Sequence, residues 1–496
     1  MARTVPGIRA ALQGSELDGV GGPALRIAEA AASRGGRAYL VGGFVRDWLL
    51  GRRSPDLDME VFGVDSELLR DLLAEVTGRR PEPAGRSFPV FKVFLEAGDV
   101  IDVGLPRRDL STGPGDPDYA IEIDPELELR DAAARRDFSI NAVYLDPLTE
   151  QIADPFGGTL DLDRRVLRAV DPASFVEDPL RVCRAAQFAG RFELELDPAT
   201  LQLMRKMVET GQLDSLPSER VSSEVQKLLL QSERPSTGLE VLRETGVCER
   251  HFPELFSLIG VEQDSEYHPE GDVWIHTCMV VDAAARIVRR DADQLTGDEP
   301  LQILTSALVH DFGKPAVTER VQERVRAHAH ELRAEQPIRA FLARLHFPAI
   351  CLRTALIATS LHLRPGQLES DFERGNLDEK RYANAVRRVL RSMSGVHWRV
   401  VLAVVEADLS GRSTPDALEH ADRVVRRFRS SVERFDLERQ VREPLLRGSD
   451  LLALGLPSGP EVGNWIERVE ALRDRGELET RDQALDWLRA RLRDQA

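Results

Sequence analysis

The chain has 496 residues, of which 42% are hydrophobic and 30% charged, and its 83 acidic and 66 basic side chains give a formal net charge of −17. This acidic balance argues against broad, non-specific nucleic-acid binding, which favours basic surfaces, but it leaves room for an enzyme with a local basic groove. No apolar run reaches the roughly 18 residues of a membrane span, and residues 1–22 lack the apolar segment of a secretory signal, so we expect a cytoplasmic protein that does not enter a membrane.

The length predicts about three or four domains, beginning with an extension and a mixed region of strands and helices. Residues 1–36 are polar and predict one short helix over 23–34. From 37 to about 170, short apolar segments typical of strands alternate with turns, and the dipeptide at 97–98 predicts a hairpin. A loop over 107–118 is rich in Gly, Pro and Asp, and such long loops inside a compact domain are usually functional or mobile. We therefore expect one α+β domain over 37–170.

The rest of the chain predicts helices, because apolar residues recur at helical spacing. We divide it into a region over 171–260, a region over 268–412 with most of the histidines, and a strongly charged region over 413–496 in which no chemistry is visible. Individual helices are expected over 198–210, 217–230 and 236–244.

The first chemical motif combines a glycine pair, an arginine and two carboxylates. An apolar segment leads into Gly42 and Gly43, where backbone N–H groups can approach a phosphate, and Arg46 adds a fork of donors for it. Asp56 and Asp58 are two residues apart, so on a strand they point to the same side and can share a divalent metal ion. A surface turn with scattered charges is the alternative, but it does not account for all these elements in this order. The motif predicts a site that holds a nucleoside triphosphate while a nucleophile attacks it.

Two further motifs place arginine beside aspartate. In RRDFSINAVYLD, Arg136 could bind phosphate and Asp137 could accept a hydrogen bond from a ribose hydroxyl. The alternative is a basic helix C-terminus followed by a buried strand. In EDPLRVCRAAQF, the residues Asp178, Arg181 and Arg184 would lie close to one helical face, where carboxylate and guanidinium could read the edge of a base. The alternative there is an intrahelical Asp–Arg pair.

Taken together, these motifs resemble the bacterial CCA-adding enzyme and poly(A) polymerase family, which belongs to the nucleotidyltransferase superfamily related to polymerase β. The segments GGFVRD, DLD, RRDFSINA and EDPLRVCRAAQFAGRFELELD occur in that order, and PSERVSSEVQKLLL resembles the neck of the family. The resemblance covers roughly residues 37–260. It implies an α+β fold class, with a polymerase-β-like head built from a mixed sheet and helices, followed by an all-α neck.

The resemblance also implies roles for individual residues. Asp56 and Asp58 would be catalytic and would hold two Mg²⁺ ions. Asp178 and Arg181 would form a protein template that selects C or A. The residues implied for nucleotide binding are Gly42, Gly43, Arg46, Arg136, Asp137, Asp178, Arg181 and Arg184.

Three other features bear on this reading. The loop over 107–118 matches the flexible loop that CCA-adding members need for the switch to A. The family usually has an arginine where this chain has Gln187, and Asp102 is a candidate third carboxylate. In two-metal catalysis one ion activates the 3′-hydroxyl of an RNA end and the other neutralises charge on the leaving pyrophosphate, which fits the absence of an obvious nucleophile in the sequence.

A second constellation of His and Asp residues lies in the region over 268–412. These side chains occur on otherwise apolar helices, which is costly unless they are paired or bound to metal. A lone histidine on such a face is more often a satisfied core residue, but an adjacent His-Asp pair with His upstream and Asp downstream predicts a metal site. The candidates are His276, His310, Asp311, His328, His330, His362 and Asp408.

The segment HDFGKP resembles the HD-domain metal phosphohydrolases, and HPEGDVWIHT resembles the C-terminal half of multifunctional CCA proteins. The resemblance implies an all-α HD domain over 268–412 that hydrolyses phosphomonoesters or 2′,3′-cyclic phosphates. Its divalent metal, of open identity, would be held by His276, His310, Asp311 and Asp408. His328, His330 and His362 would complete a second metal position or bind substrate phosphate, although the family's glycine-rich context is altered here to HAHEL.

We therefore predict a tRNA nucleotidyltransferase that adds C, C and A to the tRNA 3′ end from CTP and ATP, followed by an HD phosphohydrolase domain. One alternative is a poly(A) polymerase, or an enzyme that adds only CC or only A, although GRSFPVFKVF lacks the basic-aromatic run of the poly(A) branch. Another alternative is an HD phosphohydrolase with an inactive N-terminal half, against which the intact DLD, RRD and EDPLR segments argue. A non-catalytic RNA-binding scaffold fits poorly with the net charge of −17. The oligomeric state stays open.

Overall fold

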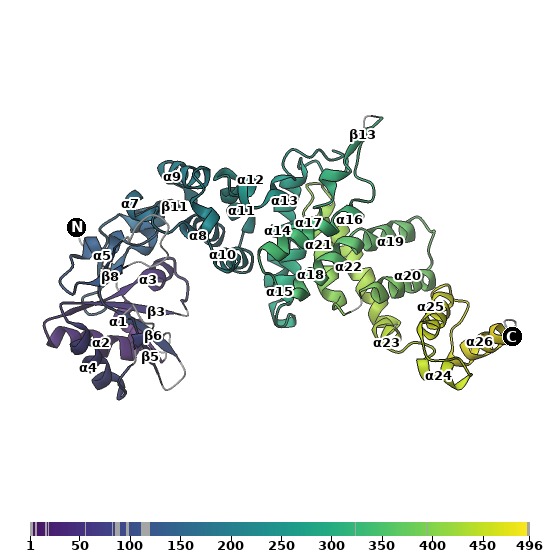
Figure 1. Cartoon of the computed structure of the whole chain (residues 1–496), viewed down its shortest axis with the longest axis horizontal. Helices are drawn as coiled ribbons and strands as arrows, with labels where there is room; N and C mark the ends of the chain where they lie inside the picture. Colours follow the sequence, from purple (N-terminus) through teal and green to yellow (C-terminus); the bar gives the residue numbers. More distant parts are fainter. Residues whose placement is uncertain are drawn as a thin grey trace. The chain divides into compact units, whose positions relative to one another are not determined.

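The computed structural model describes residues 3–4, 7–14, 17, 19–54, 56–81, 83–84, 90–95, 99–110, 120–322, 324–393 and 395–493 (Figure 1). The chain folds into two compact units. The first comprises Met1–Leu216 and Glu240–Gly246, and the second comprises Pro217–Leu239 and Val247–Ala496. In the described part of the chain, no helix is both long enough and apolar enough to cross a membrane.

The first unit is built on a mixed sheet with eight strands in its described part, in the order β1-β10-β9-β2-β3-β6-β5-β4. Neighbouring strands pair antiparallel, except for β3 and β6, which are parallel. The predicted hairpin is present as β5 and β6, although the dipeptide at 97–98 lies outside the described residues. In sheet order the strands are Arg3–Thr4 (β1), Gln151–Ala153 (β10), Tyr144–Leu145 (β9), Arg37–Val41 (β2), Leu57–Phe62 (β3), Val100–Gly104 (β6), Val90–Phe94 (β5) and Pro83–Ala84 (β4).

Helices pack against this sheet through apolar faces that the sequence pattern already shows. Helix α4, Ser66–Thr77, begins where the Asp65 carboxylate accepts a hydrogen bond from the Leu68 N–H and ends at Gly78, whose φ of 70° suits glycine. Its buried leucines join one core with α1 and α2 and with strands β2, β3, β5 and β6. The other helices of this layer are α1 (Ile8–Gln13), α2 (Gly21–Ser33) and α3 (Gly42–Leu49).

The predicted N-terminal extension over 1–36 is therefore part of the head. Ile8 and Ile27 are fully buried in the head core, and Arg3 pairs with Ile152 in the sheet. The predicted helix over 23–34 is present as α2, but α1 and β1 were not expected. Both elements are short and have polar residues beside them in the sequence, so no local pattern indicates that α1 packs on the head core and that β1 pairs with β10.

Small helices and hairpins complete the first unit. The predicted loop over 107–118 begins in strand β7, and residues 111–119 lie outside the described residues. The segment over 198–210 forms α9 as predicted. The elements are Arg107–Leu110 (β7), Ala120–Ile123 (β8), Leu129–Ala134 (α5), Ser139–Asn141 (η2), Gly158–Arg164 (α6), Val166–Leu167 (β11), Pro172–Phe175 (α7), Leu180–Phe192 (α8), Glu195–Leu196 (β12), Pro198–Glu209 (α9) and Gln212–Ser215 (η3).

The second unit is helical, with one small hairpin of Glu319–Val321 (β13) and Arg324–Arg326 (β14). At its centre α15 packs against α14, α18 and α21, and α10 packs on α15. Helices α15 and α21 are apolar and buried on nearly every face, as expected for helices that are surrounded by others. Their bounds are Ser218–Gln231 (α10), Val273–Arg290 (α14), Glu299–Val309 (α15), Ala349–Leu361 (α18) and Trp398–Ser410 (α21).

The structure divides the chain differently from the predicted domains. The predicted neck over 171–260 is shared between the two units. The predicted boundary after residue 412 is crossed, because Val405 and Leu409 of α21 share a buried cluster with Ala421 and Val424 of α22. A separate cluster of buried hydrophobic residues is formed by α24, α25, α26 and the segments between them. The helices of this C-terminal part are Ala417–Arg434 (α22), Leu437–Arg442 (α23), Gly448–Ala453 (α24), Pro460–Asp474 (α25) and Arg481–Arg493 (α26).

Candidate active sites

The first site is a group of carboxylates at the start of β3. Asp58 on β3 lies directly opposite Asp102 on β6, since the two are Cα partners in the parallel pair. Asp56 comes just before the strand. Burial raises the pKa of Asp58 to about 6, with Asp102 and Asp56 adding to the rise and Arg136 opposing it. The positive charge around Asp58 therefore does not fully offset the burial of its carboxylate.

These carboxylates fit a divalent cation. One oxygen of Asp102, Oδ1, is buried without a hydrogen-bond partner in the described structure, while Lys92 Nζ lies 3.4 Å from the other. A pocket of about 200 Å³ opens on Asp58 and Asp102 and is also lined by Arg107 and Arg136. Carboxylate oxygens around a polar pocket are the ligands that Mg²⁺ prefers. Asp102, the candidate third carboxylate of the sequence motif, thus lies beside the predicted metal ligand Asp58.

The glycine pair begins helix α3 next to this pocket. Gly42 has a φ of 67°, and a Cβ there would lie 3.2 Å from Arg136 Nη1 and 3.5 Å from Asp58 Oδ2. The positive φ favours glycine here, and a Cβ would also crowd the Arg136 guanidinium. Gly43 follows within the first turn, where helix N–H groups lack intrahelical acceptors and can bind phosphate.

Arg46, predicted to bind phosphate, is not among the described residues that line this pocket. It is 4% exposed, and it donates to the Asp47 carboxylate and to Asn141 Oδ1, both at 2.8 Å. Its guanidinium carbon also lies 4.3 Å from the centre of the Phe192 ring. Arg46 thus joins α3 to η2 and α8.

A buried carboxylate that the sequence did not single out holds the arginine pair. Glu60, on the same face of β3 as Asp58, accepts hydrogen bonds from Arg135 Nη2 at 3.0 Å, Arg136 Nη2 at 3.2 Å and the Tyr144 hydroxyl at 3.0 Å. Burial alone would raise the pKa of Glu60, but the two guanidinium groups bring it below its ordinary value. Acidic residues at every second position, Asp56, Asp58 and Glu60, were the sequence signal that could have placed Glu60 on the same strand face as the two aspartates.

Asp137 and Arg184, both predicted to contact nucleotide, contact each other. The Arg184 guanidinium donates to Asp137 Oδ2 from Nε at 2.9 Å and from Nη2 at 2.6 Å. The other oxygen of Asp137 accepts from Asn141 Nδ2 and from the Phe138 N–H. Burial opposes ionisation of Asp137, but these donors bring its pKa below the ordinary value. Arg184 and Asp137 therefore connect α8 to the head.

The predicted helical face of Asp178, Arg181 and Arg184 is only partly correct. Helix α8 begins at Leu180, so Asp178 precedes it, and its carboxylate accepts from the Leu180 N–H at 3.1 Å. Arg181 donates to the Ser174 carbonyl at 2.7 Å and to the Arg135 carbonyl at 2.6 Å. Gln187, where the family usually has arginine, is buried at 3% exposure.

The second site is a buried cluster of His and Asp in the second unit. His276 comes from α14, His310 ends α15, Asp311 follows it, and Asp408 comes from α21. All of them are at most 2% exposed. The Nε2 atom of His276 lies 3.1 Å from Asp408 Oδ1, and Nε2 of His310 lies 3.2 Å from Asp311 Oδ2. The structure thus brings together the four residues predicted to hold the first metal of this centre.

A second group adjoins the first through Asp311. Ligand atoms of Asp311, His330 and His362 lie within 4.8 Å of one another, and so do those of His276, His310 and Asp408. His330 Nε2 is 3.4 Å from Asp311 Oδ1, so the two oxygens of this carboxylate face different histidines. His328, predicted with them, is exposed and lies in neither group.

The imidazoles are oriented by their backbone neighbours. Nδ1 of His310, His330 and His362 lies 2.8, 3.1 and 2.7 Å from the carbonyls of the residues three positions earlier. Each ring therefore donates Nδ1–H to a carbonyl and keeps Nε2 available as a ligand, a common arrangement around metals. Burial lowers the pKa of His362 to about 4, which keeps the ring neutral as a ligand requires.

Unpartnered polar atoms indicate that this cluster fits a divalent metal. Both oxygens of Asp311 and Nε2 of His310 and His330 are buried without an aligned hydrogen bond in the described structure, although Lys314 Nζ lies 2.6 Å from Asp311 Oδ2. Gly313 allows the two groups to meet, since a Cβ there would lie 1.9 Å from the His330 carbonyl oxygen. Neutral imidazole and carboxylate ligands suit several transition metals, so the donor set does not select one of them.

Glu270 and His268 are further members of the site that the sequence motif contained but that we did not single out. Glu270 Oε1 lies 2.9 Å from Nδ1 of both His276 and His268, and Oε2 accepts from the Ser413 N–H at 3.1 Å. Burial works against the charge of Glu270, but these contacts lower its pKa below the ordinary value. The carboxylate therefore orients His276 with Nε2 toward Asp408. The spacing H-x-E-x₅-H, which runs from His268 into the first turn of α14, is the sequence signal that could have identified Glu270 and His268.

A pocket of about 690 Å³ opens on this centre. Its lining includes His362 and Asp408 together with Arg364, Arg374 and Arg412. Arg412 Nη2 lies 3.1 Å from Asp408 Oδ2. Arginines next to buried metal ligands provide positive charge for an anionic substrate.

Comparison with known proteins agrees with this geometry. The family described as Poly A polymerase head domain matches residues 38–168, and the one described as Probable RNA and SrmB- binding site of polymerase A matches 193–259. A multifunctional CCA protein of Xanthomonas campestris pv. campestris (strain B100) is 40% identical over 335 residues, which are 67% of this chain and 76% of that protein. The chain belongs to the multifunctional CCA protein family. Another member, from Cupriavidus taiwanensis, is 36% identical over 397 residues, 78% of this chain and 86% of its own length.

Solved structures show the same fold. A Thermotoga maritima CCA-adding enzyme complexed with tRNA superposes with a TM-score of 0.62 at 19% identity, covering 99% of both chains. The Bacillus stearothermophilus CCA-adding enzyme in complex with CTP gives a TM-score of 0.61 at 22% identity, covering 95% of this chain and 98% of that one. The α+β head followed by helices, predicted from the sequence, is thus confirmed for this member of the multifunctional CCA protein family. The two matched family descriptions end at residue 259, before the residues of the His–Asp centre.

Proposed function

We propose that this chain is a tRNA nucleotidyltransferase that adds C, C and A to the tRNA 3′ end from CTP and ATP. The observation that carries the proposal is the pairing of Asp58 with Asp102 across β3 and β6, beside the glycine start of α3. Membership in the multifunctional CCA protein family supports the choice of substrate. Because tRNA is the substrate, we place the activity in the cytoplasm.

In this proposal Asp56, Asp58 and Asp102 hold Mg²⁺. When bound, the ions activate the 3′-hydroxyl and offset charge on the leaving pyrophosphate. The residues of the chain position the nucleotide: N–H groups at the start of α3 and the Arg136 guanidinium receive the phosphates, and Glu60 keeps Arg136 in place. The protein supplies position and charge and needs no covalent nucleophile.

Base selection is assigned to Asp178 and Arg181. Arg181 already donates to the carbonyls of Ser174 and Arg135, which hold its guanidinium still. A guanidinium has further N–H groups that can reach a base edge, and the Asp178 carboxylate can accept from an exocyclic amine. A template must be rigid to discriminate, and these carbonyl contacts supply that rigidity.

The test is incorporation of labelled CTP and ATP by the purified protein on tRNA transcripts ending at the discriminator base, at C and at CC. Two C and one A, dependent on Mg²⁺, would support the proposal. Addition of only C or only A would indicate division of labour with a partner enzyme, long A-tails would indicate a poly(A) polymerase, and no addition would leave the second unit as the only active half.

We further propose that the His–Asp centre hydrolyses phosphomonoesters or 2′,3′-cyclic phosphates, because its buried metal ligands adjoin an arginine-lined pocket. His276, His310, Asp311 and Asp408 hold the first metal, and Asp311, His330 and His362 can hold a second. When bound, the metal activates water and polarises the phosphoryl group. Arg364, Arg374 and Arg412 receive the phosphate.

Substitutions separate the two activities. Asp58→Asn should lower nucleotide addition by more than about a hundred-fold and leave hydrolysis of 2′,3′-cyclic AMP intact, whereas His310→Ala should do the reverse. Loss of a metal ligand should exceed the roughly 10–100-fold effect of losing a residue that only supports a ligand. Loss of both activities from either change, in protein that stays folded, would contradict two independent sites.

A further inference from the structure

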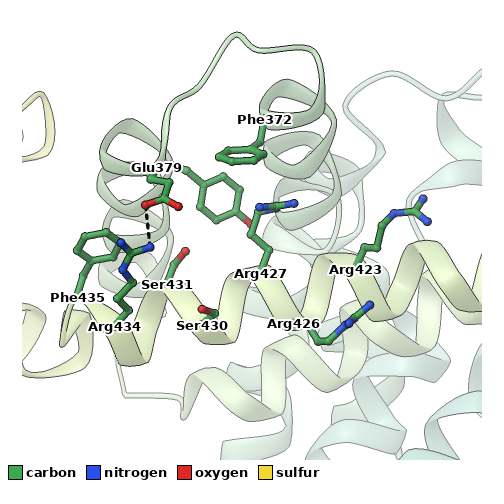
Figure 2. A pocket seen from close by; sticks show the side chains of 10 residues that line it. Phe372, Glu379, Arg423, Arg426, Arg427, Ser430, Ser431, Arg434 and Phe435 are labelled. Carbon is green, nitrogen blue, oxygen red and sulfur yellow. Dashed lines mark hydrogen bonds and ion pairs between the residues drawn. The ribbon is translucent and has the colours of Figure 1, made fainter.

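A pocket in the second unit lies outside both proposed sites. It has a volume of about 350 Å³ and shares no lining residue with the pocket at the metal centre. It is formed where helix α22 packs against α19, Arg364–Glu373, and α20, Glu379–Ser392. Figure 2 shows its lining residues, with Arg427 and Arg434 directed from α22 toward the other two helices. They are Phe372, Glu379, Tyr382, Arg423, Arg426, Arg427, Ser430, Ser431, Arg434 and Phe435.

One arginine of this pocket is fixed in place. Arg427 Nε donates to Glu369 Oε2 at 2.6 Å, and Glu369 is fully buried. The guanidinium carbon of Arg427 also lies 4.0 Å from the centre of the Phe372 ring. Stacking and a buried partner hold this cation in one geometry, so that binding an anion requires little reorganisation.

Two other arginines of the pocket are paired with exposed acids. Arg434 lies 2.7 Å from Glu379, and Arg426 lies 2.7 Å from Asp422. Glu379 and Asp422 have side chains that are 62% and 59% exposed. Exposed ion pairs contribute little stability, so a phosphate, which presents more acceptor oxygens and more charge, can displace these carboxylates.

One buried polar group of the pocket has unused hydrogen-bonding capacity. Tyr382 is 1% exposed, and its hydroxyl has no hydrogen-bond partner in the described structure. Burial, aided by the charge of Glu369, raises the pKa of Tyr382, which keeps the phenol able to donate. Buried polar atoms are usually satisfied, so this hydroxyl indicates a ligand or ordered solvent in the pocket. Arg423, by contrast, is already paired, since its Nε lies 3.4 Å from Glu373 Oε1 and its Nη1 3.0 Å from Glu419 Oε1.

We propose that this pocket binds one nucleoside phosphate unit. The guanidinium groups on α22 and the hydroxyls of Ser430 and Ser431 match the phosphate. The Phe435 ring, which lies 5.3 Å from the Arg434 guanidinium carbon, would pack beside the base together with this arginine. The volume is at the lower end of the range of small-molecule sites, which suits one nucleotide rather than a longer ligand. The unit can be a free mononucleotide or a nucleotide of an RNA strand.

The test is equilibrium binding of AMP, inorganic phosphate and a short oligoadenylate to the full-length protein in EDTA, which suppresses metal-dependent binding elsewhere. The double variant Arg426→Gln/Arg434→Gln should weaken nucleotide binding at least about ten-fold. Arg429→Gln is the matched control, since Arg429 lies on the same helix but lines a different pocket. It should leave the affinity within about two-fold. Tyr382→Phe, which keeps the ring in the core, should weaken binding without unfolding the protein.

The relative affinities of AMP and oligoadenylate distinguish a free mononucleotide from a nucleotide of an RNA strand. Tighter binding of AMP than of oligoadenylate, lost in the double variant, would identify a free mononucleotide, and the reverse order would identify RNA. Three results would overturn the proposal: equal affinity for inorganic phosphate and nucleotide, equal weakening by Arg429→Gln, or no effect of the double variant. Hydrogen exchange of α22 in the presence of AMP gives a second, local readout, and protection should be confined to wild-type protein and Arg429→Gln.

Discussion

Arg136 donates from Nη2 to Oε2 of Glu60 across 3.2 Å, and the same carboxylate accepts from Arg135 and Tyr144. Arg136 lies beside Gly42 and lines the pocket that contains Asp58. Glu60 contacts the arginine pair, so in the proposed function it is a positioning residue that acts through Arg136. Its location two residues after Asp58 places both carboxylates on one face of the same strand.

Glu60→Gln should therefore raise the KM for both CTP and ATP about ten-fold with a smaller effect on kcat, because Arg136 loses a charged acceptor. The buried arginine pair would also lose its counter-charge, which should lower the free energy of unfolding by about 1–3 kcal/mol. Steady-state kinetics and hydrogen exchange of β3 measure the two effects. Glu75→Gln, in an exposed ion pair with Arg34, is the control. An unchanged KM in the folded variant would show that Arg136 does not depend on Glu60.

The raised pKa of Asp58 predicts that the stability of the metal-free protein around β3 depends on pH. Its pKa in the folded state is raised from 3.8 to about 6, so the carboxyl favours folding while protonated, and that contribution is lost as the pH rises from about 4 through 6. Relative to Asp58→Asn, wild-type protein in EDTA should lose roughly 2–3 kcal/mol of local stability over this range. Hydrogen exchange of β3 and β6 amides checks it.

Saturating Mg²⁺ at pH 7.5 should remove this difference, because the cation stabilises the ionised carboxylate. A wild-type protein whose β3 stability is independent of pH between 4 and 7 in EDTA would contradict the raised pKa of Asp58.

Glu270→Gln should weaken metal binding at the His–Asp centre by about 10–100-fold, because His276 loses the carboxylate that orients it. The measurement is metal affinity by calorimetry and metal content after dialysis, with nucleotide addition by the first unit as an internal check. Glu262→Gln, which breaks only an exposed pair with Arg320, is the matched control. Equal metal content in the two variants would assign Glu270 a structural role only.

Arg181→Ala should change base choice more than tRNA affinity. The substitution removes the donors that reach the Ser174 and Arg135 carbonyls together with those proposed to face the base. The ratio of C to A incorporated on transcripts ending in CC should shift by about ten-fold or more, since a good bidentate contact discriminates by roughly 1–3 kcal/mol. Arg181→Lys keeps the charge but not the fork, so it should not restore selection. An unchanged ratio would exclude Arg181 from base selection.

Local sequence determined much of the architecture of this protein. The helix-forming pattern predicted α2 and α9, and the strand pattern predicted the β5–β6 hairpin, because both depend on periodicities within one segment. The spacing of Asp56 and Asp58 and the adjacency of His310 and Asp311 likewise express chemistry within a few residues. Motifs in a fixed order then indicated the family.

Other features were decided by tertiary structure, because they join residues that are far apart in the chain. Asp102 became a partner of Asp58 through the parallel register of β3 and β6, which no local pattern specifies. His328 and His330 look alike in the sequence, but only His330 is buried against Asp311, where Gly313 allows close approach. Arg46 was predicted as a phosphate ligand from its motif, and the structure places it against Asn141 and Phe192, which lie far from it in the chain. The sequence thus specified which residue types could act as metal or phosphate ligands, and tertiary packing determined which of these side chains lie next to each other.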